Sequence, residues 1–162
     1  MPWRTTPPLD RSLGIIYDTT MLKHQIVIDT KVFISALRSR RGASYKLFTL
    51  IDAGKFEVNI SVPLVLEYEQ TAVNHISGTR LSKEDFGDLL DYICKVSNQK
   101  KVFYLWRPAL KDPKDDMVLE LAVTASCDFI VTYNKQDFQG AERFGLEVVT
   151  PREFLERIGE LL

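Results

Sequence analysis

Acidic and polar side chains occur in four separate segments of this sequence, each beside an apolar run. The candidates are Asp29, Thr30, Glu67, Asp115, Asp116, Thr132, Asn134 and Asp137. Carboxylates that meet at one point repel each other unless a cation neutralises them, and oxygen ligands suit Mg²⁺ or Mn²⁺. Both histidines, His24 and His75, lie outside these segments, which argues against a zinc site. The residue types predict a site for a hard divalent cation, provided that the fold brings the segments together.

Two of these acidic positions also have an ordinary structural interpretation. Asp29 could cap a helix through Thr30, and an aspartate in a first helical turn, a role that we assign to Asp115, interacts well with the helix dipole. Glu67 follows five residues of which four are apolar, and a half-buried carboxylate there needs a cation. We therefore expect Asp29, Glu67 and Asp116 to be the functional carboxylates.

Strand-like and helix-like stretches alternate along the chain from residue 25 onward. Strands are predicted at 25–29, 56–61, 101–106, 128–133 and 146–150, and helices at 42–54, 61–75, 81–98, 112–126 and 151–162. Such alternation is typical of an α/β fold, a three-layer α/β/α sandwich with a mainly parallel central sheet. Ligands bind such sheets beyond the carboxyl ends of the strands, so the segment after residue 28 is the first position to consider.

The expected helix boundaries depend on capping residues. The N-cap candidates are Ser61, Ser82 and Asp112, with Asp85 in capping-box spacing and Pro113 at a first helical position, and Gly54 is the candidate C-cap of the 42–54 helix. These residues satisfy backbone groups that a helix end leaves unpaired.

The totals are those of an ordinary globular chain of one domain, with 162 residues, 45% apolar and 27% charged. Residues 1–24 contain three prolines and no periodicity, so we expect a poorly ordered arm before a domain at 25–162, and Met21 offers an alternative start. The sequence has no apolar run of membrane-spanning length and no signal-peptide core, so we expect a cytoplasmic protein without membrane contact. Cys94 and Cys127 would then be reduced, buried residues.

Four segments, in order, resemble the motifs of a known family. They are VIDTKVFISAL, VPLVLEYE, DPKDDMVLELA and IVTYNKQDF. Together they resemble the PIN-domain ribonuclease family over about residues 25 to 155, and most closely its branch of toxins from toxin–antitoxin pairs (VapC-like). No motif is specific alone; the specificity comes from four of them in register on an α/β chain.

The resemblance implies metal-dependent hydrolysis of single-stranded RNA with Mg²⁺ or Mn²⁺ as cofactor. Asp29 and Asp116 match direct metal ligands, and Glu67 matches a residue that binds a second ion or holds the attacking water. Asn134 matches the fourth acidic position, and Thr132 would orient ligands and waters. The resemblance also implies a small antitoxin as partner and a homodimer formed through helices near residues 61–98.

Two positions depart from the family pattern. Lys31 stands where the family usually has Asn or Ser, and it brings a positive charge close to the expected metal. It could bind an RNA phosphate, occupy the metal's place, or attenuate the enzyme. Asn134 removes one carboxylate, which favours one metal over two, although Asp137 could compensate if its segment turns helically. Asn134 and Asp137 could equally form an Asx turn.

A basic run follows the first motif. Its residues, Arg38, Arg40, Arg41 and Lys46, are candidates for RNA phosphate contacts, and Tyr133, Trp106 and Arg107 are candidates for base stacking. Because the net charge is −1, nucleic-acid binding must depend on such a local patch.

Three other functions are compatible with an α/β fold, and one of them is a serious alternative to a nuclease. A non-catalytic RNA-binding module with Lys31 in the metal position is the main alternative to a nuclease. A phosphoacceptor receiver domain needs adjacent acidic residues at the first strand and a lysine after the last, and this sequence has neither. A dehydrogenase is excluded because no GxGxxG follows the first strand.

Overall fold

The computed structural model describes residues 23–75, 81–102 and 109–161. The strands in these residues are β1 (His24–Ile28), β2 (Phe56–Ile60), β3 (Asn98–Gln99), β4 (Phe129–Val131) and β5 (Glu147–Val149). The α-helices are α1 (Thr30–Arg38), α2 (Ala43–Thr49), α3 (Val62–His75), α4 (Lys83–Val96), α5 (Pro113–Thr124) and α6 (Pro151–Arg157), and two 3₁₀ helices are η4 (Lys135–Phe138) and η5 (Ala141–Phe144). None of the helices in this part of the chain combines the length and apolarity that a membrane span requires.

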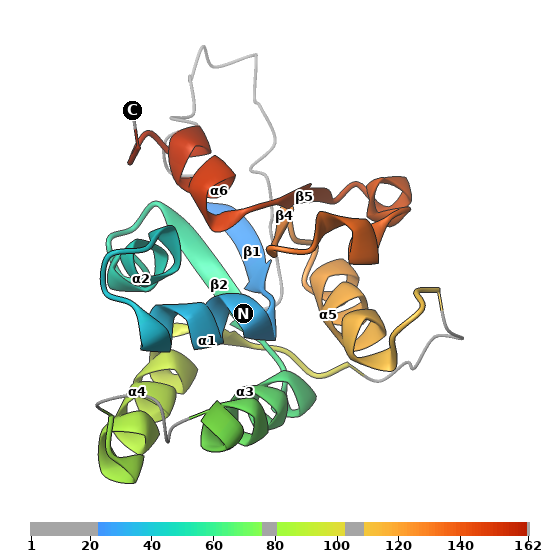
Figure 1. Ribbon diagram of the computed structural model, residues 1–162. Helices are drawn as coiled ribbons and strands as arrows, with labels where there is room; N and C mark the ends of the chain where they lie inside the picture. Colours follow the sequence, from blue (N-terminus) through green and yellow to red (C-terminus); the bar gives the residue numbers. More distant parts are fainter. Residues whose placement is uncertain (1–22, 76–80, 103–108, 162) are drawn as a thin grey trace, which may run out of the picture.

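The strands form one parallel sheet in the order β3-β2-β1-β4-β5 (Figure 1). Helices cover both faces, because consecutive residues of β1 point to opposite sides. Val27 packs in a cluster with residues of α3, α4 and α5, whereas Ile26 and Ile28 pack with residues of α2 and α6. This confirms the predicted three-layer α/β/α sandwich with a parallel sheet.

The predicted N-capping residues are confirmed. Ser82 and Asp85 form a capping box at the start of α4, and the Asp112 side chain accepts from the amide of Lys114 at the start of α5. Ser61 Oγ accepts from the amide of Leu64 at 3.3 Å before α3. These interactions join residues close in sequence, which is why the local pattern predicts them.

Two predicted helix ends are wrong, and one observed strand was not predicted. The short strand β3 lies at Asn98–Gln99, where the chain pairs with β2 directly after α4. Of the predicted strand 101–106, Lys101 and Val102 are not in a strand, and residues 103–106 lie outside the described part. Helix α2 ends at Thr49, and Gly54, with φ +89°, belongs to the turn before β2. Helix α6 ends at Arg157, because Gly159 takes the left-handed conformation that terminates helices.

The carboxyl ends of the strands meet at one edge of the sheet, as a parallel arrangement requires. Helix α1 begins two residues after β1, α3 begins two residues after β2, and α6 begins two residues after β5. The loop that follows β4 lies at the same edge. Figure 1 shows α1 and α3 starting near the ends of the central strands. Asp29 and the polar residues after β4 are therefore neighbours in space.

Candidate active site

Asp29 lies between β1 and α1, and hydrogen bonds connect it to β4 and to the first residue of α1. Its backbone amide donates to the carbonyl of Val131 at 2.9 Å, extending the β1–β4 pairing by one residue. Its Oδ1 accepts from the amide of Thr30 at 2.8 Å, and its Oδ2 accepts from the hydroxyl of Thr132 at 2.8 Å. The side chain is 8% exposed. Asp29 is therefore a helix cap and an oriented carboxylate at the sheet edge at the same time.

The electrostatic surroundings of Asp29 include charges from two other positions. Burial raises the pKa of this carboxyl, and the hydrogen bonds from Thr132 and Thr30 act in the opposite direction. The charge of Lys31 also lowers the pKa of Asp29, whereas that of Asp137 raises it. A second carboxylate and a lysine thus lie within electrostatic range of Asp29.

Asp115, in the first turn of α5, shares this environment. Its pKa is raised to about 6, first by burial and then by the negative charges of Asp29, Asp112 and Asp137, while Lys31 lowers it. Asp29, Asp115 and Asp137 therefore repel one another across three segments of the chain, and we call these three residues the acidic cluster. Their juxtaposition requires the tertiary structure, because Asp115 follows Asp29 by 86 positions.

Asp116, which the sequence favours as a ligand, has a different set of partners. Its side chain is buried, at 8% exposure, and its Oδ1 accepts from the amides of Ala109 at 3.1 Å and Leu110 at 2.9 Å. Consecutive helical residues point about 100° apart, so the side chains of Asp115 and Asp116 leave α5 in different directions. Asp116 organises the turn that leads into α5, and Asp115 faces the acidic cluster.

Glu67 is paired with a lysine. Its side chain, 19% exposed, forms an ion pair with Lys114 Nζ at 3.3 Å and accepts a hydrogen bond from the hydroxyl of Thr71 at 3.1 Å, both through Oε1. Lys114 immediately precedes Asp115, so the pair links α3 to the start of α5. The cation that this half-buried carboxylate needs is therefore supplied by the protein itself.

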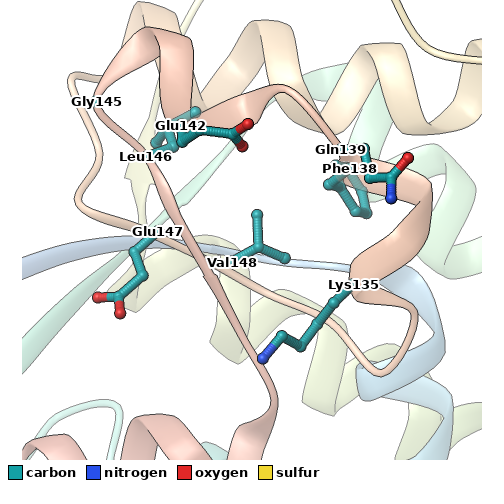
Figure 2. A pocket seen from close by; sticks show the side chains of 8 residues that line it. All are labelled: Lys135, Phe138, Gln139, Glu142, Gly145, Leu146, Glu147 and Val148. Atoms are coloured by element: carbon teal, nitrogen blue, oxygen red, sulfur yellow. The ribbon is translucent and has the colours of Figure 1, made fainter.

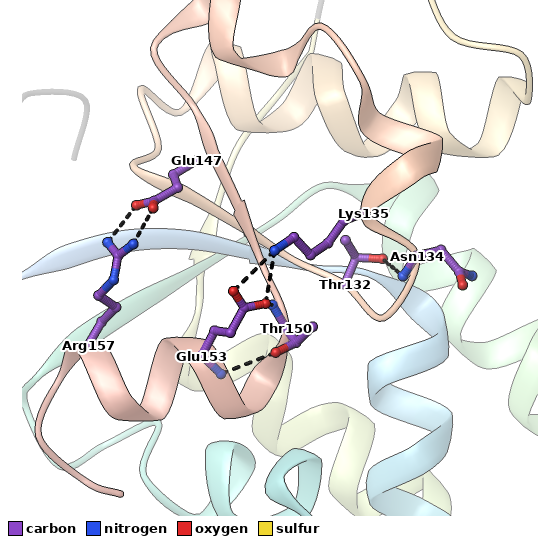
Figure 3. Close-up of polar contacts among 7 residues, drawn as sticks. All are labelled: Thr132, Asn134, Lys135, Glu147, Thr150, Glu153 and Arg157. Carbon is purple, nitrogen blue, oxygen red and sulfur yellow. Dashed lines mark hydrogen bonds and ion pairs between the residues drawn. The ribbon is translucent and has the colours of Figure 1, made fainter. Parts of the chain in front are cut away.

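The loop after β4 turns back toward Asp29. The hydroxyl of Thr132 accepts from the amide of Asn134 at 3.1 Å, while Figure 3 shows the side-chain amide of Asn134 directed away from that hydroxyl. The 3₁₀ helix η4 follows, and the amide of Asp137 donates to the carbonyl of Asn134 at 3.0 Å. The helical turn on which a contribution from Asp137 depends is thus present. Lys135, in the same turn, donates to both carboxylate oxygens of Glu153 at 3.1 Å (Figure 3).

Lys31 is exposed at the second position of α1. Its charge acts on Asp29 and Asp115, but within the described residues it forms no ion pair with either of them or with Asp116. Lys31 therefore lowers the negative potential of the acidic cluster.

Comparison with known proteins identifies the family. The family description of the PIN domain matches residues 25–136, which is more than half of the chain. This chain belongs to the PIN-domain family. A search of curated proteins finds no match to it. PIN domains are generally nucleases, and they generally use a divalent metal.

The acidic cluster of this PIN domain offers donors of the kind that such a metal needs. Among the described residues, no three His, Cys, Asp or Glu side chains converge closely enough to hold an ion. The donor chemistry nevertheless fits: Asp29, Asp115 and Asp137 are hard oxygen donors that repel one another, and a divalent cation would relieve that repulsion. Binding would require the half-buried carboxylate of Asp115 and the exposed carboxylate of Asp137 to rotate toward Asp29.

Some of the predicted RNA-contacting residues line a groove, and others lie on the surface outside it. A groove of about 550 Å³ between α2 and α6 is lined by Arg40, Arg41, Gly42, Ala43, Tyr45, Lys46, Thr49, Arg152 and Leu161. Arg38 is exposed but does not line it. Tyr133 is 45% exposed, and its hydroxyl bonds to that of Ser44 and lies 3.4 Å from that of Ser35. Trp106 and Arg107 lie outside the described residues.

A second pocket lies beside η4 and η5 and contains none of the predicted catalytic carboxylates. It has a volume of about 470 Å³, and Figure 2 shows the side chains that line it. They are Lys135, Phe138, Gln139, Glu142, Gly145, Leu146, Glu147 and Val148. Lys135 also binds Glu153, and Glu147 binds Arg157 (Figure 3), so the polar rim of this pocket already has protein partners.

Sequence reasoning missed several residues beside the acidic cluster. The hydroxyl of Tyr68 donates to the carbonyl of Ile28, the residue before Asp29, and burial together with the charge of Asp29 raises the pKa of this phenol. Lys114 and Arg152 were also missed. Tyr68 lies next to Glu67 in the sequence, which is a weak signal, and nothing in the spacing singles out Lys114 or Arg152.

Proposed function

We propose that this PIN domain is a Mg²⁺- or Mn²⁺-dependent endoribonuclease that hydrolyses phosphodiester bonds of single-stranded RNA. The observation that carries the proposal is the acidic cluster at the carboxyl edge of the sheet, where Asp29, Asp115 and Asp137 repel one another in a family of nucleases. Such repulsion persists in a fold when the charges serve a ligand.

The proposed roles follow from the contacts of each carboxylate. Asp29 is a metal ligand whose orientation is fixed by the amide of Thr30 and the hydroxyl of Thr132. Asp115 and Asp137 complete the donor set from α5 and η4. When bound, a divalent cation would neutralise phosphate charge and supply a water of lowered pKa.

In this proposal Asp116 and Glu67 support the site without contacting the reacting groups. Asp116 positions the start of α5 through its backbone contacts, and Glu67 stays paired with Lys114 unless a second ion displaces that lysine. Asn134 keeps the loop after β4 in place through its amide contact with Thr132. Separate substitution of Asp115 and Asp116 distinguishes this assignment from the one that the sequence favours.

A cellular role as the toxin of a toxin–antitoxin pair is part of the proposal. Its support is the resemblance of the four sequence motifs to that branch of the family. Growth arrest on expression, relieved by Asp29→Asn and by a small protein encoded beside this one, is the expected result. Unimpaired growth on expression of the cleaving enzyme would contradict the toxin role while leaving the nuclease intact.

The activity is tested on a labelled single-stranded RNA with Mn²⁺, Mg²⁺ or EDTA. We expect cleavage with either metal, none in EDTA, and a loss of at least about a hundredfold for Asp29→Asn because the oriented ligand is removed. Asp88→Asn is the matched control, since Asp88 is an exposed aspartate of α4. Equal cleavage by the Asp29 and Asp88 variants would reject the proposal.

The second candidate function is a non-catalytic RNA-binding protein. The observation that favours it is the charge of Lys31, which acts on both Asp29 and Asp115. In that case calorimetry detects no Mn²⁺ binding by the unsubstituted protein, and Lys31→Asn restores it. Binding of Mn²⁺ by the unsubstituted protein would leave the nuclease as the better assignment.

A further inference from the structure

The groove between α2 and α6 is lined by four cationic side chains. Arg40 and Arg41 contribute from the turn before α2, Lys46 from α2 itself, and Arg152 from the first turn of α6. None of the described residues that line it is acidic. The net charge of the chain is −1, so this cluster of positive side chains is a local feature and does not follow from the overall composition.

Most of this positive charge is available to a ligand. Lys46 Nζ donates to the carbonyl of Glu160 at 2.6 Å, which uses one of its three donors. Arg152 Nε donates to Glu156 at 3.2 Å, but its side chain is 76% exposed and such a pair within one helix contributes little. Arg40 and Arg41 have exposed side chains. The guanidinium groups can therefore reach an anion that enters the groove.

Two side-chain contacts connect this groove to the acidic cluster. The hydroxyl of Tyr133 bonds to that of Ser44, which adjoins Ala43 in the wall formed by α2. Lys135 binds Glu153, which adjoins Arg152 in the wall formed by α6 (Figure 3). The loop that carries Tyr133 and Lys135 also carries Thr132 and Asp137, so one loop connects the acidic cluster to both walls of the groove.

We propose that this groove binds phosphates of the RNA strand on one side of the scissile bond. The inference rests on the proposed function, and it adds Arg152, a residue 114 positions after Arg38, to the RNA-binding surface. The half-exposed ring of Tyr133 follows Thr132 in the chain and is held against α2 by its hydroxyl contact with Ser44, so a base can stack on it. We assign phosphate, rather than a carboxylate-bearing protein, as the ligand because the substrate of the proposed nuclease carries phosphates in series along one strand.

The test measures binding separately from cleavage. Fluorescence anisotropy of a labelled single-stranded oligoribonucleotide is followed with the full chain in EDTA, at several salt concentrations. We expect the double variant Arg40→Ala/Arg152→Ala to bind about tenfold more weakly, and the slope of log affinity against log salt to fall by roughly 0.7 for each phosphate that is no longer neutralised. Glu156→Ala should tighten binding, because it frees Arg152 from its partner.

The control is Lys95→Ala, which removes one exposed positive charge from α4, a helix whose residues do not line the groove. It should leave both the affinity and the salt slope unchanged. Equal weakening by Lys95→Ala and Arg152→Ala, equal affinity of the double variant and the unsubstituted protein, or no RNA binding at all would overturn the proposal. RNA binding that depends on the groove without any metal-dependent cleavage would overturn the proposed nuclease and, with it, the position of the groove beside a scissile bond, while the groove would remain an RNA-binding surface.

Discussion

Two neighbouring aspartates of this PIN domain have different surroundings. The Asp115 side chain faces the charges of Asp29 and Asp137, whereas Asp116 accepts hydrogen bonds from the amides of Ala109 and Leu110. One residue contributes charge to the proposed metal site and the other fixes the backbone that presents it. Substitutions at the two positions should therefore fail in different ways.

We expect Asp115→Asn to weaken Mn²⁺ binding by roughly tenfold or more, because a ligand carboxylate is removed while the fold is kept. Asp116→Ala should instead lower the free energy of unfolding by about 1–3 kcal/mol, because two backbone amides are left without their acceptor. Titration calorimetry measures the first effect and urea denaturation the second. A larger fall in Mn²⁺ affinity in Asp116→Asn than in Asp115→Asn would instead support Asp116 as the ligand.

The raised pKa of Asp115 makes a separate prediction about stability. Folding raises this pKa from 3.8 to about 6, so the ionised carboxylate destabilises the native state. The destabilisation is absent below pH 3.8, grows as the pH rises to about 6, and is complete above it. Without metal, Asp115→Asn should raise the melting temperature at pH 7 by roughly 2 °C, a small gain because the carboxyl is partly exposed and screened.

The pH dependence of the melting temperature shows whether the gain in Asp115→Asn comes from removing a repelled charge or from a stabilisation that does not depend on charge. The gain in melting temperature for Asp115→Asn should shrink as the pH is lowered from about 7 toward the ordinary aspartate pKa of about 4, measured by circular dichroism in EDTA. Asp88→Asn, on the exposed face of α4, should show no such trend. A gain that is constant across this pH range would mean that charge repulsion is not its cause.

Lys31 is the residue whose charge most directly opposes metal binding. Because it lowers the pKa of both Asp29 and Asp115, its removal should strengthen the negative potential that attracts a cation. We expect Lys31→Gln to tighten Mn²⁺ binding severalfold by calorimetry. Unchanged Mn²⁺ affinity together with weaker RNA binding would instead identify Lys31 as a phosphate contact.

At the scale of elements, an ion pair holds α3 against the start of α5. Lys114 binds Glu67 at 3.3 Å, and Glu67 lies in the segment that resembles the family's second motif. We expect Lys114→Gln to tighten Mn²⁺ binding by making Glu67 available, and Glu67→Gln to cancel that gain in the double variant. Lys111→Gln, at an exposed position before α5, is the control. Equal affinities in the unsubstituted and Lys114→Gln proteins would show that Glu67 takes no part in metal binding.

The start of α6 depends on a capping box. Thr150 Oγ1 accepts from the amide of Glu153 at 3.1 Å, and Glu153 Oε1 accepts from the amide of Thr150 at 3.1 Å. Thr150→Ala should lower the free energy of unfolding by about 1 kcal/mol in urea denaturation. Because this turn also carries Arg152, the same variant should weaken RNA binding, and unchanged RNA binding would separate the cap from the groove.

At the scale of the whole molecule, one stripe of α3 remains apolar and exposed. Val62, Leu66 and Val73 are 73%, 56% and 55% exposed, at spacings that place them along one side of the helix. The expected homodimer would cover this stripe with a second copy of the chain. Sedimentation equilibrium should show a dimer that Leu66→Glu converts to a monomer. A monomeric unsubstituted protein would contradict this expectation without affecting the fold.

The sequence by itself determined the features that depend on near neighbours. The alternation of strands and helices, the caps at Ser82 and Asp112, and the cap at Asp29 each arise from local patterns, and the structure confirms them. The strand β3, which the sequence did not predict, depends on distant residues instead. That strand has two residues and exists because the chain leaving α4 meets β2, a long-range pairing that local propensity does not encode.

Only the tertiary structure decided which charges meet. Sequence patterns identified the acidic segments but could not show that the charges of Asp29 and Asp137 act on Asp115, since that depends on how α5 is rotated against the sheet. They also could not show that Lys114 neutralises Glu67 or that Arg152 joins the basic residues of the first motif. The energy of an electrostatic interaction depends on the distance between the charges in space and not on their separation along the chain. Which charges interact is therefore decided by the packing of the elements and not by local sequence.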